Sequence, residues 1–185
     1  NAPTGMILSV GDIEEIVKTN PNNVVIVDEA YIDFGGESAV DLVRKYDNIL
    51  IVRTYSKSRS LAGGRLGFSI GSRELTGDLK KLKYSTNPYN INRLTLLAGE
   101  ACLYDEMYYK ENCQRIIENR EYTSTELLKM GFEVLPSMTN FVFVKSDKIS
   151  GETLTAKLKE NGILVRHFSK DRIKDYVRVS IGTME

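Results

Sequence analysis

Features that mark particular classes of protein are scarce in this sequence of 185 residues. It has only two cysteines, Cys102 and Cys113, and one histidine, and no grouping has the spacing of a metal site. Basic and acidic residues balance at 25 each, so no global field draws the chain to nucleic acid or to an anionic membrane. We therefore expect reduced structural thiols, no metal, no nucleic-acid partner and a cytoplasmic location.

Long apolar runs and nucleotide-binding motifs are also missing. No run approaches the roughly 20 residues of a membrane-spanning helix, so we expect no membrane insertion. Neither a GxGxxG nor a Walker pattern occurs, so no motif supports a nucleotide-binding function. The chain opens on "NAPTG" without a Met or a leader and stops at "VRVSIGTME", close to a strand. We expect a piece of a longer polypeptide.

The sequence does hold enough apolar residues, 42%, for one ordinary domain or two small ones. Residues 24–27 form an uninterrupted β-branched run, which favours a strand buried on both faces of a parallel sheet. A second apolar run covers residues 49–52, and residues 64–71 are typical of a third short strand. Helical patterns over residues 12–19 and 38–46 alternate with these runs. The alternation predicts an α/β fold.

The second half is mostly helical before it returns to strands. Apolar residues at helical spacing predict helices over residues 73–85, 93–109 and 111–129. Short strands around Pro136, a helix and further strands follow, which indicates a second, smaller α/β unit from about residue 108. The last strand, "DYVRVSIG", is expected to alternate between two faces, with Tyr176, Arg178 and Ser180 opposite Val177, Val179 and Ile181.

Polar side chains follow two of the predicted strands at the points where these strands end. In open α/β sheets, ligands bind beyond the carboxyl ends of the strands, because the loops there are free of packing. The residues that fall at this edge are Asp28, Tyr31, Thr54, Ser56 and Lys57.

Lys57 is the central candidate, although most lysines are solvated surface charges. Its place after a buried strand, between two hydroxyl residues, favours a partly desolvated amine that can attack a carbonyl. Arg65 and the hydroxyls of Thr54 and Ser56 can hold a phosphate nearby. A phosphorylated aldehyde suits both halves of this arrangement.

Asp28 and Tyr31 each have a structural and a chemical interpretation. Asp28 is a cap or structural carboxylate if it acts alone. Beside a lysine that binds an aldehyde, its carboxylate can keep the pyridine nitrogen of pyridoxal phosphate protonated, so that the ring accepts electrons. Tyr31 is either an ordinary half-buried tyrosine or a phenol directed to O3′ of the ring.

Five segments, "NAPTG", "VDEAYIDF", "TYSKSRSLAGGRLGF", "TNFVFV" and "VRVSIGT", occur in this order. Together they resemble the fold type I pyridoxal phosphate-dependent aminotransferases, and most closely the histidinol-phosphate aminotransferase family. The resemblance covers essentially the whole chain, and "DEAY" followed by "SK" and an arginine eight residues later is specific as a set. It implies that residues 1–107 are part of a large cofactor-binding domain with a mostly parallel three-layer sheet, and that residues 108–185 form a small α+β domain.

The resemblance also implies roles for the residues that match its motifs. Lys57 is similar to the lysine that binds the cofactor covalently and then moves the substrate proton, Asp28 to the partner of the ring nitrogen, and Tyr31 to the partner of O3′. The positions around the cofactor phosphate are matched by Thr54, Ser56 and Arg65.

On the substrate side, Arg178 matches the arginine that binds the α-carboxylate, for which a bidentate guanidinium is well suited. Asn140 matches a substrate-side asparagine, and Arg166 matches an arginine directed to the substrate phosphate. One position departs from the family pattern: the asparagine expected directly before "PTG" is Ala2, and Asn1 lies one residue earlier. Either Asn1 replaces the missing contact to the cofactor ring or the contact is lost.

The implied function is transfer of an amino group between histidinol phosphate or imidazole-acetol phosphate and glutamate or 2-oxoglutarate, in histidine biosynthesis, by a protein that is a homodimer when complete. Two alternatives stay open within enzymes, a related decarboxylase of a phosphorylated amino acid and an aromatic aminotransferase. A third is a folded interaction module without turnover. Because the amino-terminal half of the family is missing here, we expect the chain alone to be inactive.

Overall fold

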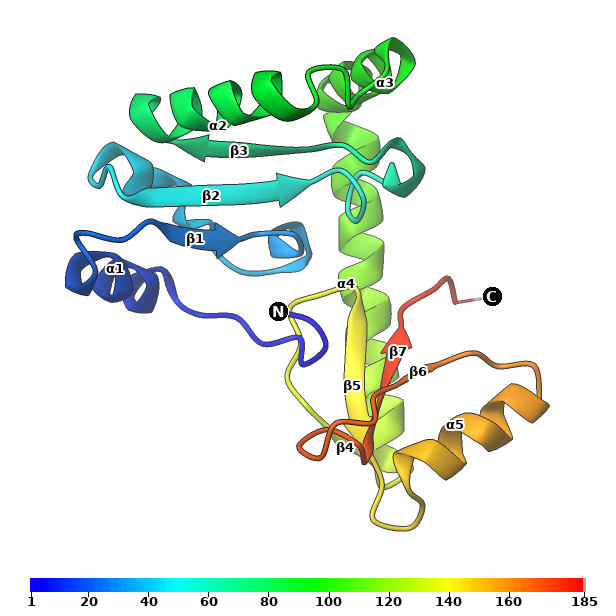
Figure 1. The fold of residues 1–185 in the computed structure, drawn as a ribbon. Coiled ribbons are helices and arrows are strands. Elements are labelled where there is room, and N and C mark those ends of the chain that lie inside the picture. The colour runs from blue at the N-terminus through cyan, green and yellow to red at the C-terminus, as the bar shows by residue number, and fades with distance from the viewer. Residues whose placement is uncertain (185) are drawn as a thin grey trace. The chain divides into compact units, whose positions relative to one another are not determined.

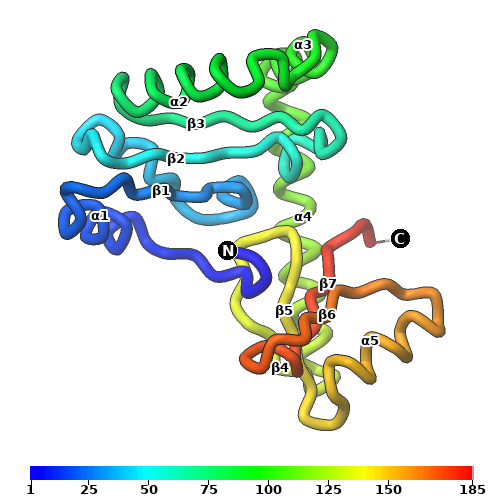
Figure 2. The backbone as a smooth tube through the Cα atoms, in the orientation of Figure 1, coloured from blue at the N-terminus to red at the C-terminus, as the bar shows by residue number. Residues whose placement is uncertain are grey.

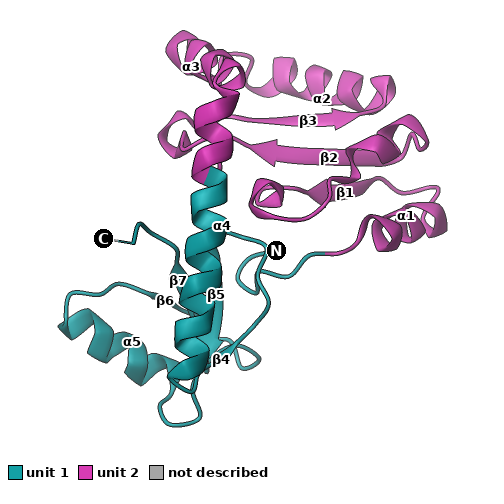
Figure 3. Cartoon of the chain, turned by 180° about the vertical axis from the view of Figure 1, so that it is seen from behind, with its two compact units in different colours: residues 1–7, 113–185 teal, residues 8–112 magenta. Residues whose placement is uncertain are grey.

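The computed structural model describes residues 1–184 and divides into two compact units. Unit 2 comprises residues 8–112, and unit 1 comprises residues 1–7 together with the chain from residue 113 onward (Figure 3). The boundary at residues 112 and 113 falls within one long helix, α4 (Glu106–Lys129).

Unit 2 is built on a sheet of three strands in the order β1 (Val25–Asp28), β2 (Ile49–Thr54) and β3 (Gly67–Gly71) (Figure 1). β1 and β2 are parallel, with Asp28 opposite Val52. β2 and β3 are antiparallel, with Thr54 opposite Gly67. The sheet is therefore mixed, and its parallel pair brings the carboxyl ends of β1 and β2 to one edge.

Helical elements precede, connect and follow these strands in the sequence. The first, α1 (Val10–Thr19), begins at Ser9, whose hydroxyl accepts from the Asp12 N–H while the Asp12 carboxylate accepts from Ser9 in a capping box. The other helical elements of unit 2 are η1 (Ile32–Phe34), η2 (Ala39–Arg44), η3 (Ala62–Gly64), α2 (Arg73–Thr86) and α3 (Arg93–Tyr104).

The core of unit 2 lies between one face of the sheet and the elements α1 and η2. Ile49 and Ile51 of β2 pack there against Val17 of α1 and Leu42 of η2. The opposite face is more open, because Ile26 in the middle of β1 is 64% exposed. The prediction that residues 24–27 are buried on both faces is therefore wrong for this chain.

Several predicted boundaries also change. Residues 38–46 contain the 3-10 helix η2 in place of a longer helix, and the third strand starts only at Gly67, because η3 occupies residues 62–64. The break between the two long helices falls at Asp105, where α3 has ended and α4 has not begun.

Unit 1 has an antiparallel sheet in the order β4 (Glu133–Val134), β5 (Phe141–Lys145), β7 (Tyr176–Ser180) and β6 (Arg166–His167). One face of this sheet packs against the helices: Val142, Val144 and Val177 contact Leu127 of α4 and Leu154 of α5 (Gly151–Glu160). This is the face predicted for Val177 and Val179, so the predicted alternation along the last strand is confirmed.

The other face of the unit 1 sheet is aromatic. The rings of Phe143 and Tyr176 stack at 4.8 Å between centroids, and Phe168 packs edge-on to Phe143 at 6.1 Å. Both Phe143 and Val142 are 0% exposed, so β5 is buried on its two faces.

The amino-terminal segment belongs to unit 1 and lies beside the residues that precede β5 (Figure 2). The Met138 N–H donates to the Gly5 carbonyl at 2.9 Å. Gly5 has φ +82°, and a Cβ there would come within 2.6 Å of the Ser137 hydroxyl, so only glycine fits this close approach. The "PTG" motif and the "TN" motif are thus neighbours in space.

Within residues 1–184, no helix combines the length and the apolar character needed to cross a membrane. The same residues bring together no group of His, Cys, Asp and Glu that could hold a metal ion. Cys113 is buried and Cys102 half-buried, and the structure joins them by no disulfide.

Candidate functional site

The carboxyl-end edge of the unit 2 sheet holds the six residues that sequence reasoning assigned to one site, namely Asp28, Tyr31, Thr54, Ser56, Lys57 and Arg65. β1 ends at Asp28 and β2 ends at Thr54, and the two strands stay paired to their ends because the Glu29 N–H donates to the Val52 carbonyl at 2.9 Å. The loops that follow the two strands therefore start side by side.

The loop after β2 runs from residue 55 to residue 65 and is held by its own backbone. The Tyr55 N–H donates to the Leu66 carbonyl at 3.1 Å, and the Leu61 N–H donates to the Tyr55 carbonyl at 3.0 Å. Ser60 and Arg65 have φ of 54° and 52°, and among the described residues they are the non-glycine residues with positive φ. Residues held in this sparsely populated region cluster at ligand-binding and catalytic sites.

Hydroxyl and guanidinium groups gather at the two ends of this loop. The Thr54 hydroxyl accepts from the Ser56 N–H at 3.0 Å, which fixes the turn directly after the strand. Thr54 pairs with Gly67 and the Tyr55 N–H bonds to Leu66, so Ser56 and Arg65 are the next residues along two paired segments. This combination of donors suits a phosphate.

Lys57 approaches the loop that follows β1. Its Nζ lies 5.3 Å from the centroid of the Tyr31 ring, so an amine and a phenol from two different loops converge. The Lys57 side chain is exposed, which differs from the partial desolvation expected from its position after a buried strand. The described residues place the amine beside Tyr31 but do not cover it.

Asp28 makes the hydrogen bond expected of a structural carboxylate. Its Oδ1 accepts from the Ala30 N–H at 2.9 Å, which forms the turn after β1. The side chain is nevertheless exposed at the same edge as Lys57, so the carboxylate is accessible to a ligand while the turn sets its direction.

Sequence reasoning missed a set of residues behind this edge. Glu29 is 5% exposed, and its carboxylate accepts from Arg53, from the Ser38 hydroxyl and from the Ala39 N–H. The Ser58 hydroxyl donates to Asp33 Oδ2 at 2.5 Å. The available signal was the carboxylates of Glu29 and Asp33 soon after a predicted buried strand, since a carboxylate that becomes buried needs partners.

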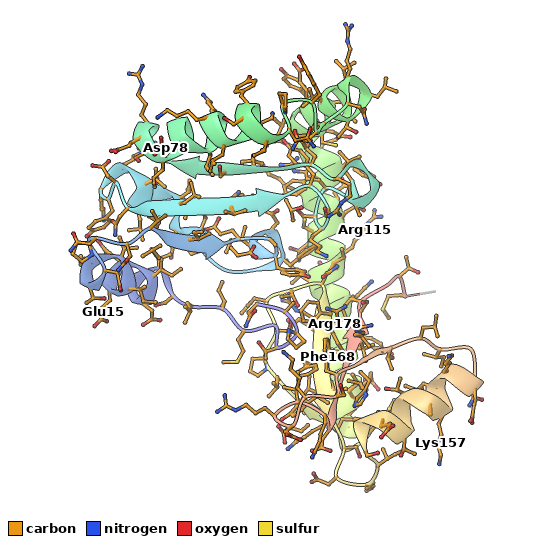
Figure 4. All side chains as sticks on the ribbon, in the orientation of Figure 1. Glu15, Asp78, Arg115, Lys157, Phe168 and Arg178 are labelled. Carbon is orange, nitrogen blue, oxygen red and sulfur yellow. The ribbon has the colours of Figure 1, made fainter. Side chains whose placement is uncertain are left out.

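The other four predicted residues, Asn1, Asn140, Arg166 and Arg178, lie in unit 1. Arg166 of β6 and Arg178 of β7 are direct cross-strand partners. Their guanidinium carbons lie 5.6 Å and 6.0 Å from the centroid of the Phe168 ring, and Figure 4 labels Arg178 and Phe168 on neighbouring segments. Like charges directly opposite each other destabilise a sheet pair, so this position favours a bound anion.

The Arg178 side chain also has an unused donor. Its Nε is buried and has no hydrogen-bond partner within the described chain, while its guanidinium carbon lies 5.0 Å from the centroid of the Phe141 ring. Buried polar atoms in native proteins almost always have a partner, so this N–H is a donor available to a bound group.

Asn140 and Asn1 flank this region within unit 1. The Asn140 carbonyl accepts from the Ile181 N–H at 2.9 Å, and the preceding Thr139 carbonyl accepts from the buried Arg120 at 2.9 Å, so the backbone at Asn140 is held from both sides. The amino group of Asn1 donates to the Met6 carbonyl at 2.8 Å.

Ionisable groups next to the aromatic face of unit 1 have shifted pKa values. Burial, with the hydrogen bond that its hydroxyl donates to Glu133 at 2.7 Å, raises the pKa of Tyr176. Hydrogen bonds from Lys145 and from Tyr176 lower the pKa of Glu133. The negative charge of Glu133 is therefore stabilised beside Tyr176, whose ring stacks on Phe143.

An amine, a carboxylate, hydroxyls and a guanidinium thus lie at one strand-end edge of a mixed α/β fold, the place where open α/β sheets bind ligands. The whole chain, residues 1–185, matches the sequence profile of the aminotransferase class I and II family, and the chain belongs to this family.

Particular relatives are close in sequence. The histidinol-phosphate aminotransferase of Brachyspira hyodysenteriae (strain ATCC 49526 / WA1) is 52% identical over 186 residues, which cover 100% of this chain and 52% of the relative. The enzyme of the same name from Clostridium botulinum (strain Okra / Type B1) is 50% identical over 185 residues, with the same coverage. The chain thus spans about half the length of the curated relatives it matches.

A solved structure agrees with this assignment. The crystal structure of the histidinol-phosphate aminotransferase from Clostridium acetobutylicum superposes with a TM-score of 0.89 at 30% sequence identity, over 100% of this chain and 57% of that one. The mixed α/β fold described above is therefore the fold of this part of a solved aminotransferase.

Proposed function

We propose that this chain is the carboxyl-terminal half of a pyridoxal phosphate-dependent aminotransferase that acts on histidinol phosphate. The observation that carries the proposal is the convergence of the Lys57 amine on Tyr31, 5.3 Å from its ring centroid, at the edge that also presents Asp28 and Thr54. The names of the relatives at about half identity support the choice of substrate.

The residues at the edge of unit 2 fit pyridoxal phosphate group by group. The Lys57 amine matches the aldehyde, the exposed Asp28 carboxylate matches a protonated ring nitrogen, and the Tyr31 phenol matches the ring hydroxyl. The hydroxyls of Thr54 and Ser56 and the guanidinium of Arg65 match the phosphate. When bound, this cofactor supplies an electron sink for the bond electrons of an amino acid.

In this proposal, the chain's own residues bind, orient and move protons. With the cofactor bound, the Asp28 carboxylate would keep a proton on the ring nitrogen, and the Lys57 amine, once the substrate amine has replaced it, would accept the substrate α-proton. Arg178 binds the substrate α-carboxylate through its two-pronged guanidinium, and Arg166 binds the distal phosphate. Asn140 orients the substrate, and Asn1 replaces the ring contact that Ala2 cannot make.

The proposal includes the organisation of the complete protein. Residues 1–107 then belong to the large cofactor-binding domain, whose mostly parallel, three-layer sheet the rest of the polypeptide completes, and residues 108–185 form the small domain. We further propose that the complete protein is a homodimer and that residues 1–185 alone do not turn over substrate.

The test is an amino-transfer assay on the full-length protein, with histidinol phosphate, phenylalanine and threonine phosphate as donors to 2-oxoglutarate. We expect histidinol phosphate to give the highest kcat/KM. Lys57→Ala should abolish transfer with every donor, whereas Lys45→Ala, which removes an exposed lysine of the same unit, should not. Faster transfer from phenylalanine, or release of carbon dioxide from threonine phosphate, would replace this proposal by one of its alternatives.

A further inference from the structure

We infer that Asp33 and Ser58 form a positioning pair, which holds the segment that carries Tyr31 against the loop that carries Lys57. This inference rests on the cofactor role proposed for Lys57. It assigns to Asp33 and Ser58 a task that acts through their neighbours, with no contact of their own to the cofactor or the substrate.

The hydrogen bond joins the two loops at the points where they carry the candidate residues. Ser58 directly follows Lys57 and is 7% exposed. Asp33 lies in η1, two residues after Tyr31. The Ser58 hydroxyl donates to Asp33 Oδ2 at 2.5 Å, across 25 positions of sequence. A displacement of either partner therefore moves the Lys57 amine relative to the Tyr31 phenol.

The Tyr31 segment lies beyond the sheet, so contacts other than strand pairing hold it, among them the fully buried side chain of Phe34. Strand pairing ends with the bond from the Glu29 N–H to Val52, and the chain then passes through η1 and the glycine pair Gly35 and Gly36. Gly36 has φ 107°, a left-handed value that favours glycine, and it lets the chain turn back toward β2. Between these points, Asp33 supplies a side-chain hydrogen bond from the segment to the Lys57 loop.

The two ends of the segment are fixed by a different group, the Glu29 cluster, which consists of Glu29, Ser38, Ala39 and Arg53. The Glu29 carboxylate accepts from Arg53 Nε at 2.9 Å, from the Ser38 hydroxyl at 2.8 Å and from the Ala39 N–H at 2.7 Å. A buried carboxylate with this many partners stabilises the fold locally. The Glu29 cluster thus anchors the two ends of the segment. The positioning pair joins the middle of the segment, where Tyr31 lies, to the Lys57 loop.

The chemistry of the bond suits a positioning role. A hydroxyl that donates to a carboxylate forms a short, charge-assisted hydrogen bond, stronger than a neutral one. Ser58 is buried, so water cannot readily take the place of its hydroxyl when it is removed. Misplacement of a reacting group by about 1 Å can cost about a hundredfold in rate, so a small shift of the Tyr31 segment has a measurable effect.

The experiment uses the full-length protein in the parent form and as Ser58→Ala, Asp33→Ala, the double variant and Asp33→Asn. Cofactor-free protein is mixed with pyridoxal phosphate, and the rate at which the visible absorption band forms is measured together with the visible circular dichroism of the bound cofactor. Thermal unfolding is recorded for each variant. Ser85→Ala is the matched control, because it removes a hydroxyl from an exposed helical position of the same unit.

We expect Ser58→Ala and Asp33→Ala each to slow band formation about tenfold and to change the visible circular dichroism. The double variant should form the band no more slowly than the single variants, because each single substitution already removes the same hydrogen bond. Asp33→Asn keeps an acceptor oxygen for Ser58 and should lie closer to the parent than Asp33→Ala does. Ser85→Ala should match the parent.

Parent-like band formation and circular dichroism in Ser58→Ala would overturn the inference, and so would additive effects in the double variant. Changes confined to thermal unfolding would also overturn it, since they would show a purely structural bond. If the parent itself attaches no cofactor at Lys57, the proposed function fails and the inference falls with it. If the parent attaches cofactor and the variants behave like the parent, the inference alone fails.

Discussion

The sheets of the two units differ in how completely their strands are buried. In unit 1, β5 is a central strand whose residues Phe141–Val144 are all buried, because helices α4 and α5 pack on one face and an aromatic layer covers the other. In unit 2, β1 is an edge strand with packing on one face, and Ile26 on its other face is 64% exposed. Two similar apolar runs therefore form strands that differ in burial, one covered on both faces and the other on one face.

An apolar run indicates a strand, but it does not indicate how far each face of the strand is buried. A run of β-branched residues predicts a strand in both units, but the cover on each face depends on segments far away in the sequence. Because the relatives are about twice as long as this chain, we expect the rest of a full-length protein to cover the Ile26 face. Unit 1 contains its own cover, and its paired Arg166 and Arg178 are brought together within the chain.

The largest effect is expected at the paired arginines of unit 1. In the full-length protein, Arg178→Lys should lower kcat/KM for every donor by about a hundredfold, because lysine cannot reproduce a bidentate carboxylate contact. Arg166→Lys should raise KM for histidinol phosphate more than KM for phenylalanine, which has no phosphate. Steady-state kinetics checks both, with Arg73→Lys, an exposed arginine of α2, as the control. Equal losses for the two donors in Arg166→Lys would contradict the separate roles.

The Glu29 cluster of unit 2 gives the next largest effect. Glu29→Gln leaves Arg53 without its carboxylate in a largely buried site, and we expect a loss of about 3 kcal/mol in the free energy of unfolding. Glu37→Gln, at an exposed position of the same segment, should change it by less than about 0.5 kcal/mol. Urea titration followed by circular dichroism measures the difference, and equal stability of the two variants would remove the anchor proposed for the Tyr31 segment.

A matched pair of valines tests the comparison of the two sheets directly. Val144→Ala in β5, where the side chain is 1% exposed, should cost about 2 kcal/mol in the free energy of unfolding. Val24→Ala, directly before β1 and 50% exposed, should cost less than about 0.5 kcal/mol in the 185-residue chain. In the full-length protein the cost at Val24 should rise if the additional half covers this face. Equal costs at the two positions in the shorter chain would show that unit 2 is not open there.

The smallest expected effect is a pH dependence in unit 1. Hydrogen bonds from Lys145 and Tyr176 lower the pKa of Glu133 from 4.5, so its stabilising contribution is fully present above pH 4.5 and fades as the pH falls through the lowered pKa. The melting temperature of Glu133→Gln should therefore lie below that of the parent at neutral pH, and the gap should close as the solution is acidified below pH 4.5. A gap that stays constant down to low pH would assign the effect to packing.

Local patterns predicted the parts of the molecule that depend on neighbours in sequence. The alternation of Tyr176 and Val177 follows from strand geometry, and the meeting of Asp28 with the end of β2 follows from parallel pairing. The bond between Ser58 and Asp33 and the opposition of Arg166 and Arg178 depend on tertiary register, which no local period reveals. The sequence predicts a strand after the helix of residues 151–160, but β6 is only two residues long, so its length did not follow from the local pattern.

All the roles proposed for this chain depend on covalent binding of the cofactor by the Lys57 amine. The most direct measurement is borohydride reduction of the full-length protein with pyridoxal phosphate, followed by proteolysis and mass spectrometry of the peptides. We expect one reduced adduct, on the peptide that contains Lys57, and none in Lys57→Ala. An adduct on a different lysine of the parent, or no adduct in the intact protein, would contradict this role of Lys57.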